Sequence, residues 1–125
     1  MSEKNKIIVT AKPRYIEAQS SPDDDRYVFS YTIHIENQGQ LSARLLSRHW
    51  LITDANGKIQ EVTGEGVIGK QPLIQPGESF SYSSGAVVET PVAVMQGQYL
   101  MENSDGEQFN TAIPKFTLSI PRVLH

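Results

Sequence analysis

The most regular pattern in the chain is an alternation of apolar and polar residues from Tyr27 to Asn37. The apolar members of this pattern are Tyr27, Phe29, Tyr31, Ile33 and Ile35. Side chains of a β-strand point alternately to opposite faces, so a period of two places all of these residues on one face. The pattern predicts a core strand whose other face lies in solvent.

Shorter segments of the same kind occur along the rest of the chain, separated by turn residues. They predict strands at 7–11 with a continuation at 15–19, then at 41–53, 59–63, 73–74, 79–83, 95–102, 109–113 and 116–120. Pro13 places the first strand at a sheet edge, because proline cannot donate to a strand ladder. About eight to nine short strands without a convincing helical period predict an all-β sandwich.

Several single residues refine this prediction. Trp50, in the middle of the strand at 41–53, is expected to fill the space between the two sheets. Ser21 followed by Pro22 is typical of the start of one helical turn, and Thr90 with Pro91 has the same signal for at most one turn. Pro114 and Pro121 are expected to break the last strands.

Composition limits the possible functions. The chain has 125 residues, a net charge of −3 and no cysteine. The eleven lysines and arginines are dispersed, so nucleic-acid binding is not supported, and a disulfide framework or thiolate metal site is excluded. We expect one domain, 1–125, with residues 1–6 flexible, in a cytoplasmic protein without a membrane span or signal peptide.

A glycine-rich segment between Gly64 and Lys70 has the spacing of two phosphate-binding motifs, G-x-G-x-x-G and G-x-x-x-x-G-K. Both motifs require a following helix, and the second requires a hydroxyl residue after the lysine. Gln71 occupies that position here, and Pro72 disfavours a helical conformation of Gln71. A nucleotide hydrolase is therefore disfavoured.

Two interpretations of this segment remain. It is either a structural loop or a backbone nest whose N–H groups bind phosphate, pyrophosphate or a nucleotide weakly, helped by a lysine. The residues of the predicted nest are Gly64, Glu65, Gly66, Gly69 and Lys70. Glu65 would repel an anion unless it is paired or coordinates a cation.

No catalytic, cofactor or metal site is predicted. The histidines, His34, His49 and His125, are too dispersed in sequence to indicate a metal centre. Ser79, Ser81, Ser83 and Ser84 show no nucleophile-elbow pattern and are expected on the solvent face of their strand.

Four separated motifs closely resemble the bacterial ApaG family over nearly the whole chain. They are GEGVIGKQPLIQPGE at 64–78, YIEAQS at 15–20, WLIT at 50–53 and ETP at 89–91. The resemblance implies an immunoglobulin-like or fibronectin type III-like β-sandwich. Ala93 departs from the glycine that usually follows Thr-Pro-x in this family, which affects only the detail of that turn.

The resemblance also bears on function. The family name associates it with cobalt and magnesium homeostasis, in which a chain without a membrane span can at most sense or assist. ApaG domains also occur as modules of larger eukaryotic proteins. We therefore expect a non-enzymatic protein-interaction module, with another protein as partner and a monomeric or weakly dimeric state. The alternatives are the anion-binding loop and an unrecognised hydrolase.

Overall fold

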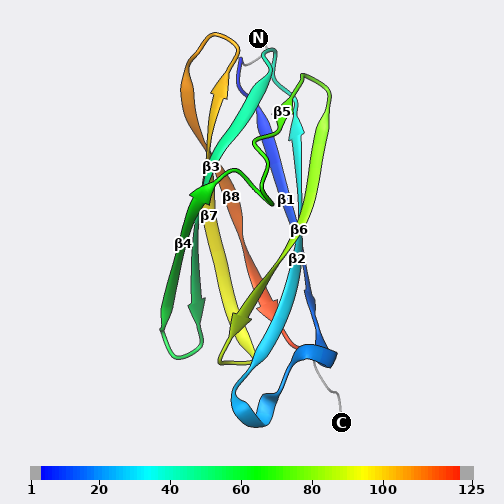
Figure 1. The fold of residues 1–125 in the computed structure, drawn as a ribbon, viewed down its shortest axis with the longest axis vertical. Coiled ribbons are helices and arrows are strands. Elements are labelled where there is room, and N and C mark those ends of the chain that lie inside the picture. Colours follow the sequence, from blue (N-terminus) through cyan, green and yellow to red (C-terminus); the bar gives the residue numbers. More distant parts are fainter. Residues whose placement is uncertain (1–3, 122–125) are drawn as a thin grey trace.

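The computed structural model describes residues 4–121, which form eight β-strands and two short 3₁₀ turns (Figure 1). The strands are β1 (Ile7–Tyr15), β2 (Tyr27–Asn37), β3 (Ala43–Asp54), β4 (Ile59–Glu65), β5 (Leu73–Ile74), β6 (Ser79–Val88), β7 (Val92–Asn103) and β8 (Gln108–Ser119). The 3₁₀ turns are η1 (Glu17–Gln19) and η2 (Pro22–Asp24). The predicted all-β class is confirmed.

The strands form two antiparallel sheets packed face to face, consistent with the predicted immunoglobulin-like or fibronectin type III-like sandwich. One sheet has the order β1-β2-β6, and the other has the order β4-β3-β7-β8. β5 pairs with β3 next to the segment that pairs with β4. The second sheet is thus one strand wider than the first, and the residues of β4 are mostly exposed.

The core lies between the sheets and contains the residues that the alternation predicts. All five apolar residues of the β2 pattern are at most 8% exposed. Trp50, on β3, is 2% exposed, and its ring lies edge-on to those of Tyr31, Tyr99 and Phe116. The prediction that Trp50 fills the space between the sheets is confirmed. Val28, on the other face of β2, is also buried, beside the segment that contains η1.

The region around Pro114 differs from the prediction of two strands separated by a break. β8 is continuous, because Pro114 and Lys115 together lie opposite the single residue Gln96 in a β-bulge. A bulge leaves a residue without a ladder partner, so it accommodates the missing N–H of proline.

Two other local predictions need correction. The first strand ends at Tyr15, and residues 17–19 form η1 instead of a continuation. Thr90 and Pro91 form a bend without a helical turn, in which the Thr90 hydroxyl donates to the Val92 carbonyl at 2.7 Å. Short polar side chains can stabilise either a cap or a bend, and the local sequence does not distinguish the two.

Part of the N-terminal segment is hydrogen-bonded to the turn after β2, and the flexibility of residues 1–6 stays a prediction. The Lys4 carbonyl accepts hydrogen bonds from the backbone of Gln40 and Leu41, and the Lys6 carbonyl accepts one from Gln38. Residues 1–3 lie outside the described residues.

Candidate functional site

The glycine-rich segment leaves the end of β4 and crosses toward the other sheet (Figure 1). It is attached to a bulge in β3, at which Leu46 is the extra residue. The Leu46 carbonyl accepts hydrogen bonds from the Gly66 N–H at 2.8 Å and from Gln71 Nε2 at 2.9 Å. Gln71, which stands where a P-loop needs a hydroxyl, thus holds the segment against β3.

The tip of this segment is a two-residue hairpin turn. Val67 and Lys70 exchange backbone hydrogen bonds of 2.8 and 2.9 Å, and both central residues have positive φ, 45° at Ile68 and 75° at Gly69. These are the features of a type I′ turn, which favours asparagine or glycine at its first central position. A β-branched residue with positive φ is strained, so Ile68 is an unfavourable residue at this point.

The glycines of the segment have different roles. Gly66 has φ of 61°, and a side chain there would collide with the Lys70 carbonyl oxygen, so this position needs glycine for two reasons. Gly64 lies within β4 and does not have a positive φ. A side chain at Gly64 would instead meet the guanidinium group of Arg48 at 2.7 Å.

The predicted anion nest has few N–H groups for a ligand. The Gly66 N–H donates to Leu46, and those of Val67 and Lys70 donate to each other's carbonyl groups. Within the turn, therefore, at most the N–H groups of Ile68 and Gly69 are left to donate to a ligand. Of the five predicted nest residues, Glu65, Gly69 and Lys70 are exposed, whereas Gly64 is half-buried and Gly66 is buried. Whether they bind an anion stays a prediction.

Arg48 is the residue of this region that the sequence analysis missed. It lies on β3 on the same face as Trp50, and its side chain is partly buried. Arg48 Nη1 donates to the carbonyl oxygens of Glu65 at 3.1 Å and Gly66 at 2.8 Å. The available signal is its spacing: Arg48 stands two residues before Trp50 and four before Ile52, so an arginine occupies a predicted core face.

A cavity of about 270 Å³ lies between Arg48, the hairpin turn and the other sheet. Its walls include Tyr31 of β2, Arg48 and Trp50 of β3, Tyr82 and Ser84 of β6, and residues 67–69 of the turn. We call this cavity the Arg48 hollow. It is open because the inward position on β6 next to Tyr82 is the small residue Ser84, which is exposed.

The tyrosines around the Arg48 hollow form a buried polar cluster with Tyr99 of β7. The hydroxyl oxygens of Tyr82 and Tyr99 are 2.5 Å apart. Burial raises the pKa of Tyr82 to about 12 and raises the pKa of Tyr99 further. Burial also raises the pKa of Tyr31, opposed by its hydrogen bond with Ser84 and by the charge of Arg48. All three phenols are therefore neutral at physiological pH.

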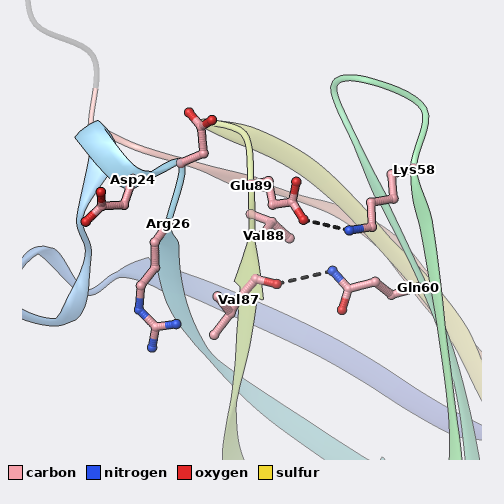
Figure 2. A pocket seen from close by; sticks show the side chains of 8 residues that line it. Asp24, Arg26, Lys58, Gln60, Val87, Val88 and Glu89 are labelled. Carbon is pink, nitrogen blue, oxygen red and sulfur yellow. Dashed lines mark hydrogen bonds and ion pairs between the residues drawn. The ribbon is translucent and has the colours of Figure 1, made fainter.

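A second, more open cavity of about 590 Å³ lies farther along the space between β4 and β6 (Figure 2). Two side chains cross this space, as Figure 2 shows. Gln60 Nε2 donates to the Val87 carbonyl at 3.2 Å, and Lys58 Nζ lies 2.6 Å from Glu89 Oε1. We call the space between β4 and β6, which includes both cavities, the open seam.

The four edge strands of the sandwich differ in composition. β1 contains Lys12 and Pro13, and β8 contains Pro114 and Lys115. Lysine and proline at a sheet edge prevent another strand from pairing with it. The strands of the open seam, β4 and β6, contain neither residue.

Comparison with known proteins identifies the family. The model of the ApaG domain matches residues 17–103. The chain belongs to the ApaG family. It is 58% identical to Protein ApaG of Azoarcus sp. (strain BH72) over 99% of this chain and 98% of that protein. It is 51% identical to Protein ApaG of Escherichia coli O1:K1 / APEC over 96% of both chains.

A solved structure supports the same assignment. The crystal structure of a Bordetella pertussis protein described as ApaA superimposes with a TM-score of 0.95, at 42% identity, over 98% of this chain and 100% of that one. The family resemblance inferred from the separated motifs is thus confirmed. The names of these ApaG relatives state no enzymatic activity.

The histidines of this ApaG-family chain have ordinary protein partners where the structure describes them. His34 Nδ1 lies 2.7 Å from Ser81 Oγ on the outer face of the β1-β2-β6 sheet, and His49 Nε2 lies 2.7 Å from Glu61 Oε2. Within residues 4–121, no three His, Cys, Asp or Glu side chains are grouped to hold a metal ion. His125 lies outside this range.

No helix in the described part of the chain combines the length and apolar character needed to cross a membrane.

Proposed function

We propose that this ApaG-family protein is a non-enzymatic protein-binding module and that a partner protein inserts an extended segment into the open seam. The observation that carries this proposal is the contrast between the sheet edges: β1 and β8 contain lysine and proline, whereas β4 and β6 do not. An extended segment can add to an unprotected edge by backbone hydrogen bonding.

The free edge of β4 has the properties that such pairing needs. β4 pairs along its length with β3, and its opposite edge has no strand partner among the described residues. Exposed apolar side chains, Ile59 and Val62, lie on this strand, and Val87 lies across the seam on β6. Backbone pairing supplies affinity and apolar side chains at alternate positions supply specificity in this kind of recognition.

A matched pair of variants tests the proposal. Val62 and Ile8 are 38% and 39% exposed, but Val62 lies on β4 and Ile8 lies on β1. Affinity capture from cell extract is carried out with the parent protein, Val62→Lys and Ile8→Lys. We expect a partner that Val62→Lys loses and Ile8→Lys retains, since a lysine at the seam opposes strand pairing.

The recovered partner is then titrated as a purified fragment while backbone amide signals are followed. Shifts concentrated in residues 59–65 and 79–88 are the expected result. Equal loss of partners in both variants, or shifts confined to β1 and β8, would contradict the proposal. Pairing of two copies through β4 is a competing outcome, which sedimentation of the pure protein detects. The association with cobalt and magnesium homeostasis stays a prediction.

A further inference from the structure

One residue that lines the Arg48 hollow carries a buried hydrogen-bond donor without a protein acceptor. Trp50 forms part of its wall, and its indole Nε1 is buried and has no hydrogen-bond partner among the described residues. Buried polar groups are nearly always hydrogen-bonded, and an unpaired one is costly. This N–H is itself buried, so a ligand in the cavity can accept a hydrogen bond from it only if a neighbouring side chain moves.

Arg48 adds a positive charge to the same cavity. Its Nη1 donates to two carbonyl oxygens, whereas its Nε and Nη2 have no acceptor among the described residues. No carboxylate of residues 4–121 lies within 4.0 Å of the guanidinium, which includes that of Glu65 at the cavity rim. A guanidinium in this state has three N–H groups left to donate. Charge-assisted hydrogen bonds to an oxyanion are stronger than those between neutral groups.

The cavity size restricts the ligand. A volume of about 270 Å³ is close to the lower end of small-molecule sites, which begin near 300 Å³. This space is large enough for a small oxyanion and is smaller than most small-molecule sites.

We propose that the Arg48 hollow binds a small oxyanion, with the guanidinium of Arg48 supplying both the charge and the hydrogen bonds, next to the buried indole of Trp50. Phosphate, pyrophosphate and a carboxylate share this chemistry. The proposal goes beyond protein binding, because its ligand is a small molecule. It also differs from the predicted anion nest, since Lys70 does not line the cavity and three of the loop N–H groups bond within the protein.

The protein carries its own probe, because Trp50 is the single tryptophan of the sequence. The experiment titrates inorganic phosphate, pyrophosphate and acetate, each to about 20 mM, well above a millimolar dissociation constant. Ionic strength is held constant with sodium chloride, and a chloride-only titration is the control. The indole N–H signal and the tryptophan fluorescence are both followed. Saturable movement of the indole signal with at least one oxyanion, absent with chloride, is the expected result.

Three variants locate the site. Arg48→Gln removes the charge and should weaken binding about 10-fold or more. Gly64→Ala keeps every charge but places a methyl group against the guanidinium, so it should displace Arg48 and give a similar loss. Lys70→Ala is the matched control, because it removes a positive charge from the same segment outside the cavity, and it should change binding less than about 2-fold.

The outcomes separate the proposal from its alternatives. Binding of phosphate but not of acetate, or of acetate but not of phosphate, identifies the class of oxyanion that the site prefers. No saturable shift with any of the three ligands overturns the proposal. A larger loss in Lys70→Ala than in Arg48→Gln also overturns it, in favour of the loop nest. The backbone amide spectrum of each variant shows whether the β-sandwich is intact, and Gly64→Ala decides the question if Arg48→Gln does not fold.

Discussion

On one side of the sandwich β1 and β8 contact each other between the sheets. On the other side β4 and β6 are bridged by the side chains of Gln60 and Lys58 (Figure 2). Both sides end in antiparallel edge strands of the same kind. The difference is partly geometric, because a sheet of order β4-β3-β7-β8 faces one of only three strands. β4 therefore has no strand directly against its whole inner face.

The two sides also differ in how their edges are protected. Lys12 and Pro13 protect β1, and the bulge at Pro114 and Lys115 protects β8. Their protection shows that this fold can prevent edge pairing where pairing is unwanted. The lack of such residues in β4 and β6 is therefore informative about function, and it is the basis of the proposed protein-binding role.

The interior beside β4 and β6, the open side, is more polar than the interior beside β1 and β8, the closed side. Arg48, Tyr31 and Tyr82 line the Arg48 hollow there. The Tyr82 hydroxyl is hydrogen-bonded with that of Tyr99, and Arg48 Nη1 donates to the Gly66 carbonyl, whereas Arg48 Nε and Nη2 have no acceptor among the described residues. Buried polar groups cost stability when they are unpaired. A guanidinium with free N–H groups beside a cavity is a stronger indication of binding than the cavity alone.

The largest expected effect tests whether the open side belongs to the same core as the closed side. Trp50→Ala should lower the free energy of unfolding by about 3 to 5 kcal/mol, because it removes the largest fully buried side chain. Leu118→Ala on β8 is the matched change on the closed side and should cost about 2 to 5 kcal/mol. Urea unfolding followed by circular dichroism measures both. A cost below about 1 kcal/mol for Trp50→Ala would place it outside the core.

Alkaline pH should lower the free energy of unfolding through the buried tyrosines beside the open side. Folded Tyr82 has a pKa of about 12 and that of Tyr99 is also raised, whereas unfolded tyrosine titrates near 10. Unfolded chains therefore lose protons first, and stability is fully present below pH 10 and falls above it. The expected slope is about 1.4 kcal/mol per pH unit for each tyrosine. Because the pKa of Tyr31 is raised as well, Tyr82→Phe should reduce this slope by about one-third, as urea unfolding between pH 9 and pH 12 would show.

An intermediate effect concerns the strained turn over the Arg48 hollow. Ile68→Asn should raise the free energy of unfolding by about 1 kcal/mol, because asparagine tolerates positive φ and suits a type I′ turn. Ile68→Val is the control, since valine is equally β-branched and should give no gain. Thermal unfolding compares the two variants. A loss of stability in Ile68→Asn would show that the exposed isoleucine contributes packing that outweighs its strain.

The smallest effect is expected for the lysine substitutions at the two sides. Val62→Lys and Ile8→Lys should each change the free energy of unfolding by less than about 0.5 kcal/mol, because both side chains are already more than one-third exposed. Chemical unfolding of both variants checks this. A cost above about 2 kcal/mol for Val62→Lys alone would mean that the open seam is covered within the protein.

Much of the fold could be predicted from local patterns. The alternation in residues 27–37 identifies the faces of β2, because burial of one face requires it. Pro13 indicates an edge strand, and Pro76 with Gly77 predicts the turn before β6, where Gly77 has φ of 84°. The bulge at Pro114 could not be predicted, since it depends on the register that β8 takes against β7.

The candidate site was predicted less well. The sequence indicated the glycine segment, which does border the cavity through Gly69, but it suggested backbone N–H groups as donors. Three of those groups are used by the bulge in β3 and by the hairpin turn, neither of which has a local sequence signal. Arg48 was missed although it alternates with Trp50, because spacing along a strand does not show which carbonyl groups or cavity the guanidinium meets.

By itself, the sequence determined the family, the all-β class and which side chains form the core, because these follow from separated motifs and from the period of two within each strand. The tertiary structure decided which edges remain open and which donors meet at one cavity. Arg48, Trp50 and Ser84 come from two sheets and meet only because β3 and β6 pack across the sandwich. No spacing along the chain encodes the distance between residues of two facing sheets.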